Sequence, residues 1–137
     1  MLFRSGDVVE IEFINHLSQP STVHWHGLDV PNEADGNPMD MVEPQGKKVY
    51  RFTLPQGSAG TYWYHPHPHD HVSEQVYKGL AGTFVVKAKN DPLAHLPEQH
   101  WVISDLVIKS AILSTEQTLQ QPVARQRVNN RQRLRSF

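Results

Sequence analysis

Two pairs of histidines are the residues of this sequence best suited to chemistry. His24 and His26 are separated by one residue, and His65 and His67 are separated by Pro66. In an extended strand the two histidines of a pair point to the same face, with Cβ atoms roughly 6–7 Å apart. Pro66 favours the strand because its ring fixes φ in the extended range. If the two strands are neighbours, the four imidazoles are expected to converge on one surface.

Four imidazoles without a thiolate are a donor set that suits copper or zinc. One metal could bridge a single pair only with strain, whereas two metals about 4 Å apart could each take one imidazole. His69 and His71 extend the histidine run. They follow Pro68, so we expect solvated loop residues there, with a role as extra ligands as the alternative. Metal-facing histidines are expected to lie outside the core.

The elements that must position these histidines are short strands. Val9, Ile11 and Phe13 alternate with glutamates, which predicts a half-buried strand over 8–14. Further strands are expected at 22–26, 49–54, 61–65, 81–88 and 100–107. Turn-forming residues fill 15–21, 31–46 and 55–60, and residues 66–79 are expected to be irregular. Such spacing, without a long amphipathic helix, favours an all-β sandwich or barrel.

The composition limits the remaining possibilities. A chain of 137 residues with 38% hydrophobic residues suits one domain with a modest core. There is no cysteine, which excludes disulfides, thiolate metal sites and a cysteine nucleophile. No apolar run approaches the roughly 20 residues of a membrane span, so no membrane partner is expected. The N-terminus shows no apolar segment of a signal peptide.

Charge divides the chain at about residue 109. Most acidic residues precede this point, whereas the segment 110–137 carries five arginines and one glutamate. This basic, Gln/Arg-rich tail has few large apolar residues and is expected to be poorly ordered or weakly helical; a frameshifted sequence is the other interpretation. Because only Phe137 interleaves the arginines, we expect a solvated end and no nucleic-acid partner. The expected division is 1–108 and 109–137.

Four motifs occur in the order typical of one family. They are Gly6-Asp7-Val8-Val9, the segment 22–28 around His-Trp-His-Gly, the segment 60–67 ending in Trp-Tyr-His-Pro-His, and the segment 79–86. Over residues 2 to about 105 the chain resembles the first cupredoxin domain of multicopper oxidases, with bacterial laccase-like and cuprous oxidases closest. The resemblance implies an all-β, cupredoxin-like Greek-key barrel or sandwich with an irregular C-terminal tail. It also implies copper as cofactor and a periplasmic or secreted origin.

The resemblance assigns a role to each histidine. His24 would bind the type 2 copper, His26 and His65 would share one type 3 copper, and His67 would bind the other. Asp35 resembles the acidic residue that assists proton transfer to oxygen at the cluster. A structural turn aspartate before Gly36 is the alternative for that residue.

The chain also departs from the family pattern. The family takes half of the cluster's histidines from a C-terminal domain, which these 137 residues do not contain. Without cysteine the type 1 copper site cannot form, and the family's first strand is expected to be missing, as in an isolated fragment. Two functions stay open. One is an oxidoreductase domain that a symmetric homo-oligomer completes, which would use O₂ to oxidise phenols. The other is a non-enzymatic copper-binding module or an inactive fragment.

Overall fold

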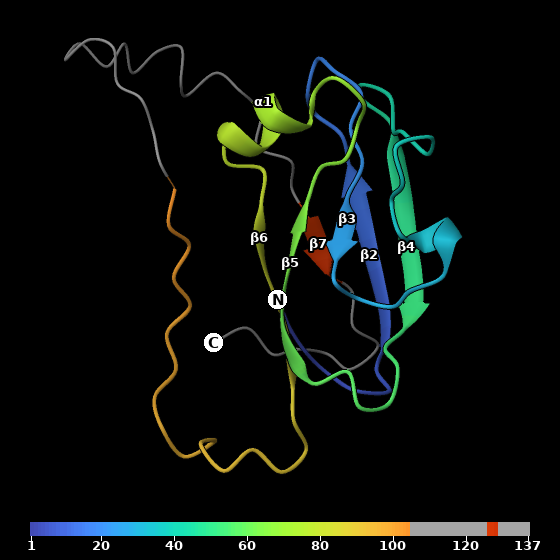
Figure 1. Ribbon diagram of the computed structural model, residues 1–137. Helices are drawn as coiled ribbons and strands as arrows, with labels where there is room; N and C mark the ends of the chain where they lie inside the picture. The colour runs from blue at the N-terminus through green and yellow to red at the C-terminus, as the bar shows by residue number, and fades with distance from the viewer. Residues whose placement is uncertain (105–125, 129–137) are drawn as a thin grey trace, which may run out of the picture.

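Two β-sheets pack face to face in the computed structural model, which describes residues 1–104 and 126–128 (Figure 1). One sheet has the strand order β1-β6-β5-β3 and the other β4-β2-β7. The elements are β1 (Leu2–Arg4), β2 (Val8–Ile14), β3 (His24–His26), the 3-10 turn η1 (Asn32–Ala34), β4 (Lys47–Thr53), β5 (Gly60–His65), α1 (Val72–Tyr77), β6 (Gly82–Lys87) and β7 (Gln126–Val128). The predicted all-β sandwich is confirmed.

Strand β2 shows how the sequence pattern becomes a layer. Val9, Ile11 and Phe13 are buried between the sheets, whereas the intervening glutamates face outward. Antiparallel pairing with β4 places Ile11 opposite Tyr50, which is also fully buried. The outer face of β2 therefore carries the charged side chains, and its inner face packs in the core.

Trp25 occupies the centre of that core. Its side chain is fully buried, and the rings of Tyr50, Phe52 and Phe84 lie with their centroids 5.5, 5.6 and 5.8 Å from it. The indole Nε1 donates a hydrogen bond of 2.9 Å to the backbone carbonyl of Ala34. Because successive side chains of a strand alternate between its faces, a buried Trp25 directs His24 and His26 to the outside.

Several elements differ from the expectation. Residues 2–4 form β1, which pairs in parallel with β6, and residues 72–77 form the helix α1 inside the segment expected to be irregular. Both are too short for a clear periodic signal, and α1 buries only one residue, Gln75. Residues 126–128 of the predicted irregular tail pair with β2 as β7; the rest of the tail lies outside the described residues.

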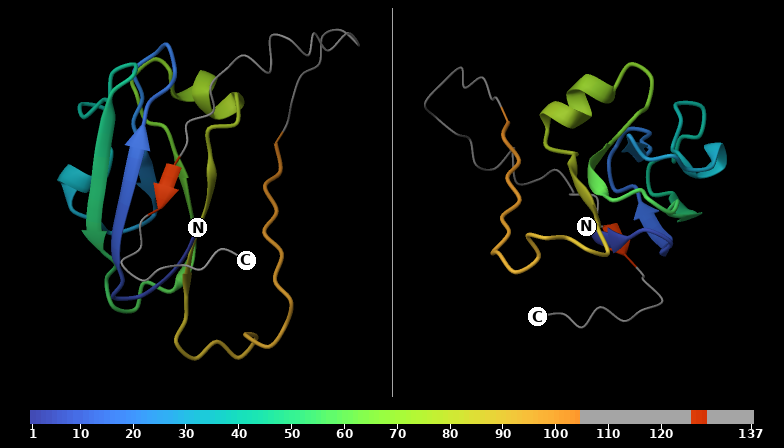
Figure 2. Two further views of the ribbon diagram at one scale, coloured as in Figure 1. Left: turned by 180° about the vertical axis from the view of Figure 1, so that it is seen from behind. Right: turned by 60° about the horizontal axis from the view of Figure 1, so that its bottom comes forward.

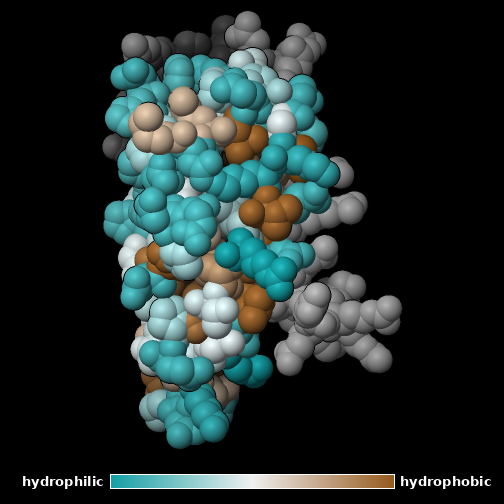
Figure 3. Space-filling view, turned by 90° about the vertical axis from the view of Figure 1, so that its right-hand side faces the viewer, coloured by the Kyte–Doolittle hydropathy of each residue, from teal (hydrophilic) through white to brown (hydrophobic). Residues whose placement is uncertain are grey.

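The predicted strand over 100–107 is wrong for its described part, residues 100–104. After β6 the chain leaves the sandwich as an extended segment, yellow to orange in Figure 2. Trp101 and Ile103 are 78% and 90% exposed, so their apolar alternation finds no sheet to pack against. Within the ranges described, no helix is long and apolar enough to span a membrane. The face around β4 is mainly hydrophilic with separate apolar side chains (Figure 3).

Candidate metal centre

The histidines meet on the outer face of the β3–β5 pair. These strands are antiparallel, and His24 lies opposite His65, Trp25 opposite Tyr64, and His26 opposite Trp63. Trp25 and Tyr64 face the core, so the two flanking pairs must face the other way. Gly27 ends β3 with φ of 87°, a conformation that favours glycine.

Three imidazoles are close enough to hold metal in common. The ligand atoms of His24, His26 and His65 all lie within 4.8 Å of one another. His26 Nδ1 and His65 Nε2 face each other at 3.2 Å. The ring centroid of His24 lies 5.6 Å from that of His26 and 5.3 Å from that of His65. The predicted convergence is therefore confirmed for these three histidines, which we call the histidine trio.

His67 lies beside the trio rather than within it. It follows β5 after Pro66, and its ring centroid is 5.3 Å from that of His24 and 5.8 Å from that of His65. Its Nδ1 is buried and has no hydrogen-bond partner among the described residues. Buried polar atoms are normally paired, so this nitrogen is available to a ligand from outside the protein.

His69 and His71 lie further away in the fold. His69 is exposed in the loop before α1, and His71 is the residue immediately before the helix. The imidazole Nδ1 of His71 lies 3.9 Å from the carboxylate of Glu74, one turn along the helix. Neither residue belongs to the histidine trio.

Hydrogen bonds to backbone carbonyls determine which ring nitrogen of His24 and of His65 can bind a metal ion. His24 Nδ1 lies 3.1 Å from the carbonyl of Asp35, and His65 Nδ1 lies 2.9 Å from the carbonyl of Pro66. A carbonyl can only accept, so each Nδ1 must donate its proton and each Nε2 keeps a free lone pair. Metal-binding histidines are commonly held in this way by a second hydrogen bond.

Asp35 also approaches His24 through its side chain. Its buried Oδ1 lies 3.0 Å from His24 Nδ1 but has no directed hydrogen bond to any described residue, so the contact is mainly electrostatic. Gly36 explains why this loop lies so close to β3. A Cβ atom there would come within 1.9 Å of the Val23 carbonyl oxygen, and φ is 66°. Asp35 is thus both a residue of a tight turn and a neighbour of the trio.

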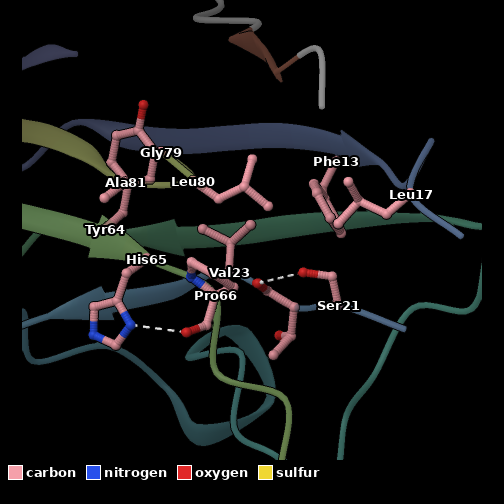
Figure 4. A pocket seen from close by; sticks show the side chains of 11 residues that line it. Phe13, Leu17, Ser21, Val23, Tyr64, His65, Pro66, Gly79, Leu80 and Ala81 are labelled. Carbon is pink, nitrogen blue, oxygen red and sulfur yellow. Dashed lines mark hydrogen bonds between the residues drawn. The ribbon is translucent and has the colours of Figure 1, made fainter. Parts of the chain in front are cut away.

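His65 is the most buried of the three. Only 7% of it is exposed, which corrects the expectation that metal-facing histidines lie outside the core. The ring packs at a tilt against that of Trp63, with a centroid distance of 4.3 Å. A pocket of about 230 Å³ lies beside His65 (Figure 4). The pocket is lined in part by Phe13, Leu17 and Leu80.

Burial also changes the protonation of His65. Desolvation lowers the pKa of its imidazole, the hydrogen bond to Pro66 acts in the opposite direction, and the neighbouring histidines lower the pKa further. The lowered pKa favours the neutral imidazole, which is the form that binds a metal ion. The donor chemistry, the distances within the trio and the unpaired nitrogen of His67 together fit a copper or zinc centre.

Comparison with known proteins shows the family to which this domain belongs. A family model described as multicopper oxidase matches residues 1–91. The chain belongs to the multicopper oxidase family. This domain is 43% identical over 84 residues to the multicopper oxidase mco of Staphylococcus haemolyticus, covering 61% of this chain and 19% of that protein. It is 36% identical over 107 residues to a copper resistance protein A homolog of Pseudomonas syringae pv. tomato, covering 75% and 17%.

The solved structures show the same fold. A multicopper oxidase from Campylobacter jejuni, described as a metallo-oxidase, is 53% identical, with a TM-score of 0.67 over 69% of this chain and 20% of that one. The domain therefore has the cupredoxin-like architecture, and copper is the metal that the family implies. The chain spans about a fifth of the length of the relatives it matches.

The sequence interpretation overlooked Trp63. Its ring centroid lies 4.9 Å from that of His26 and 4.3 Å from that of His65, and the planes are inclined by only 34° and 32°. The signal was present, because Trp63 precedes His65 by two residues and must share its face of β5.

Proposed function

We propose that this domain binds copper through His24, His26, His65 and His67 and supplies half of a type 2/type 3 copper cluster. The main support is the hydrogen-bonded contact of 3.2 Å between His26 Nδ1 and His65 Nε2, because a metal ion that replaces the shared proton can be bound by both nitrogens. His24 takes the type 2 role and His67 the second type 3 role. Bound copper supplies one-electron redox chemistry and an affinity for O₂.

Asp35 supports the cluster from behind His24. Its backbone carbonyl holds the Nδ1 proton, and its carboxylate places a negative charge 3.0 Å from that nitrogen. This charge makes the Nε2 lone pair of His24 a stronger donor. A buried carboxylate oxygen without a directed hydrogen bond is also positioned to accept a proton during oxygen reduction.

We further propose that a second copy of the chain completes the cluster. His26 is exposed and Trp63 is 40% exposed, so the open side of the trio is accessible. A symmetric dimer would bring the same histidines of both chains face to face. These 137 residues contain no cysteine and so provide no type 1 copper ligand; in a dimer of this chain alone, electrons from a phenol would have to reach the cluster directly, and turnover would be slow.

A non-enzymatic copper-binding module is the second candidate. It is favoured by the histidine trio itself, because three ligand atoms within 4.8 Å of one another can bind a metal ion without a further residue. Phenol oxidation under air separates the two candidates: copper-dependent product formation by a dimer supports the oxidase, and copper binding without product supports the module.

Copper binding itself is tested by metal analysis of the full chain after loading with Cu(II) and desalting. We expect the parent to retain copper and His26→Ala to retain less, because the mutation removes one of the two facing nitrogens. His95→Ala is the matched control, since His95 is exposed and lies outside the trio. Equal copper per chain in the parent and His26→Ala would refute the assignment.

A further inference from the structure

Trp63 completes a square of four rings on the outer face of the sheet. His24 lies opposite His65 and His26 lies opposite Trp63 across β3 and β5. Three corners of this square offer a ring nitrogen with a lone pair, whereas an indole offers only a donor N–H. The fourth corner therefore cannot ligate metal, and its aromatic face must serve another purpose.

The two shortest ring contacts in the square are those made by Trp63. Its centroid lies 4.3 Å from His65 and 4.9 Å from His26, while the histidine rings lie 5.3 to 5.6 Å from one another. The indole plane is inclined by 32° and 34° to the two imidazoles, so the rings pack against each other in a tilted arrangement. One side chain thus contacts both histidines whose nitrogens face each other.

Trp63 is unusually exposed for a tryptophan of a β-sheet. Trp25 is fully buried in the core, whereas Trp63 is 40% exposed and lies on the opposite face of the sheet. The side chain therefore contributes little to the core. Its stacking contacts are directed at the metal centre instead.

We infer that Trp63 is a positioning residue of the copper centre, whose ring packs against His26 and His65 and holds their ring nitrogens in the geometry for a shared copper ion. The inference rests on the proposed copper site. Stacking also favours the bound state directly: an imidazole that donates to a cation becomes electron-poor, and an electron-rich indole face attracts it more strongly. The same attraction is greater for Cu(II) than for Cu(I), so Trp63 lowers the reduction potential.

The test compares Trp63→Leu with Trp63→Phe in the full chain. Leucine keeps apolar bulk without a π-face, whereas phenylalanine keeps a smaller ring. We expect Trp63→Leu to raise the Kd for Cu(II) about tenfold in competition with a chelator, and Trp63→Phe to raise it only about twofold. The EPR spectrum of bound Cu(II) and the reduction potential should change in the same order. Trp101→Leu is the control, because Trp101 is 78% exposed and its indole N–H donates to Gln99 instead of packing against a histidine of the sheet.

Each outcome decides between the claims. If the parent binds copper and both Trp63 variants match it in Kd, EPR spectrum and potential, the positioning role is wrong while the copper site stands. If phenylalanine is as damaging as leucine, stacking is not the cause. If the parent binds no copper, the proposed function fails first. Should Trp63→Leu not fold by circular dichroism, Trp63→Met provides the same comparison.

Discussion

Replacing Trp25 by alanine is expected to destabilise the domain strongly and to weaken its copper centre. Trp25 is fully buried and contacts Tyr50, Phe52 and Phe84 at centroid distances of 5.5 to 5.8 Å. Truncating a buried aromatic residue costs about 3–5 kcal/mol, because transfer free energy and a cavity add together. The Ala34 carbonyl also loses its hydrogen bond from Nε1, which costs about 1 kcal/mol more if water cannot replace it.

A loss of this size is a large share of the roughly 5–15 kcal/mol by which small domains are stable. Urea unfolding of the metal-free protein should show a lower midpoint at an unchanged slope. Trp25→Phe is the control, since it fills part of the cavity and loses the hydrogen bond to Ala34. If Trp25→Ala cost less than about 1 kcal/mol, the indole would not be the residue that anchors β3. Copper affinity should fall together with stability in Trp25→Ala, because burial of Trp25 keeps His24 and His26 on the outer face of β3.

Two further predictions concern the surroundings of the trio. Asp35→Asn removes the charge but leaves the backbone carbonyl that holds His24, so we expect copper affinity to fall about tenfold, the lower end for such supporting residues; an unchanged Kd in chelator competition would contradict the supporting role. Burial lowers the pKa of His65 below its usual 6.5, so just below pH 6.5 the unfolded chain binds a proton that the folded chain does not. The metal-free protein should therefore lose stability as pH falls through that value, and the loss should be smaller in His65→Gln; parallel urea titrations of both proteins with the same pH dependence would exclude His65 as the cause.

The sequence alone determined the local part of the site. Spacing by two residues on a strand puts both members of His24/His26 on one face, and the aromatic Trp25 between them belongs in a core. The alternation of β2 follows from the same periodicity. The His-Trp-His-Gly and Trp-Tyr-His-Pro-His motifs were sufficient for the family. These inferences depend only on residues that are close in the sequence, so they need no knowledge of the tertiary structure.

The tertiary structure decided everything that depends on register and burial. No local rule states that His24 faces His65 while His26 faces Trp63. Strand β4 separates β3 from β5 in the chain, and their register is set by the packing of Trp25 and Tyr64 against the core. The same packing buries His65, although a metal-facing histidine was expected outside. It also decides that residues 100–104, with the alternation of a strand, find no partner: a periodic pattern shows which face is apolar, but only the fold determines whether a sheet edge is available to it.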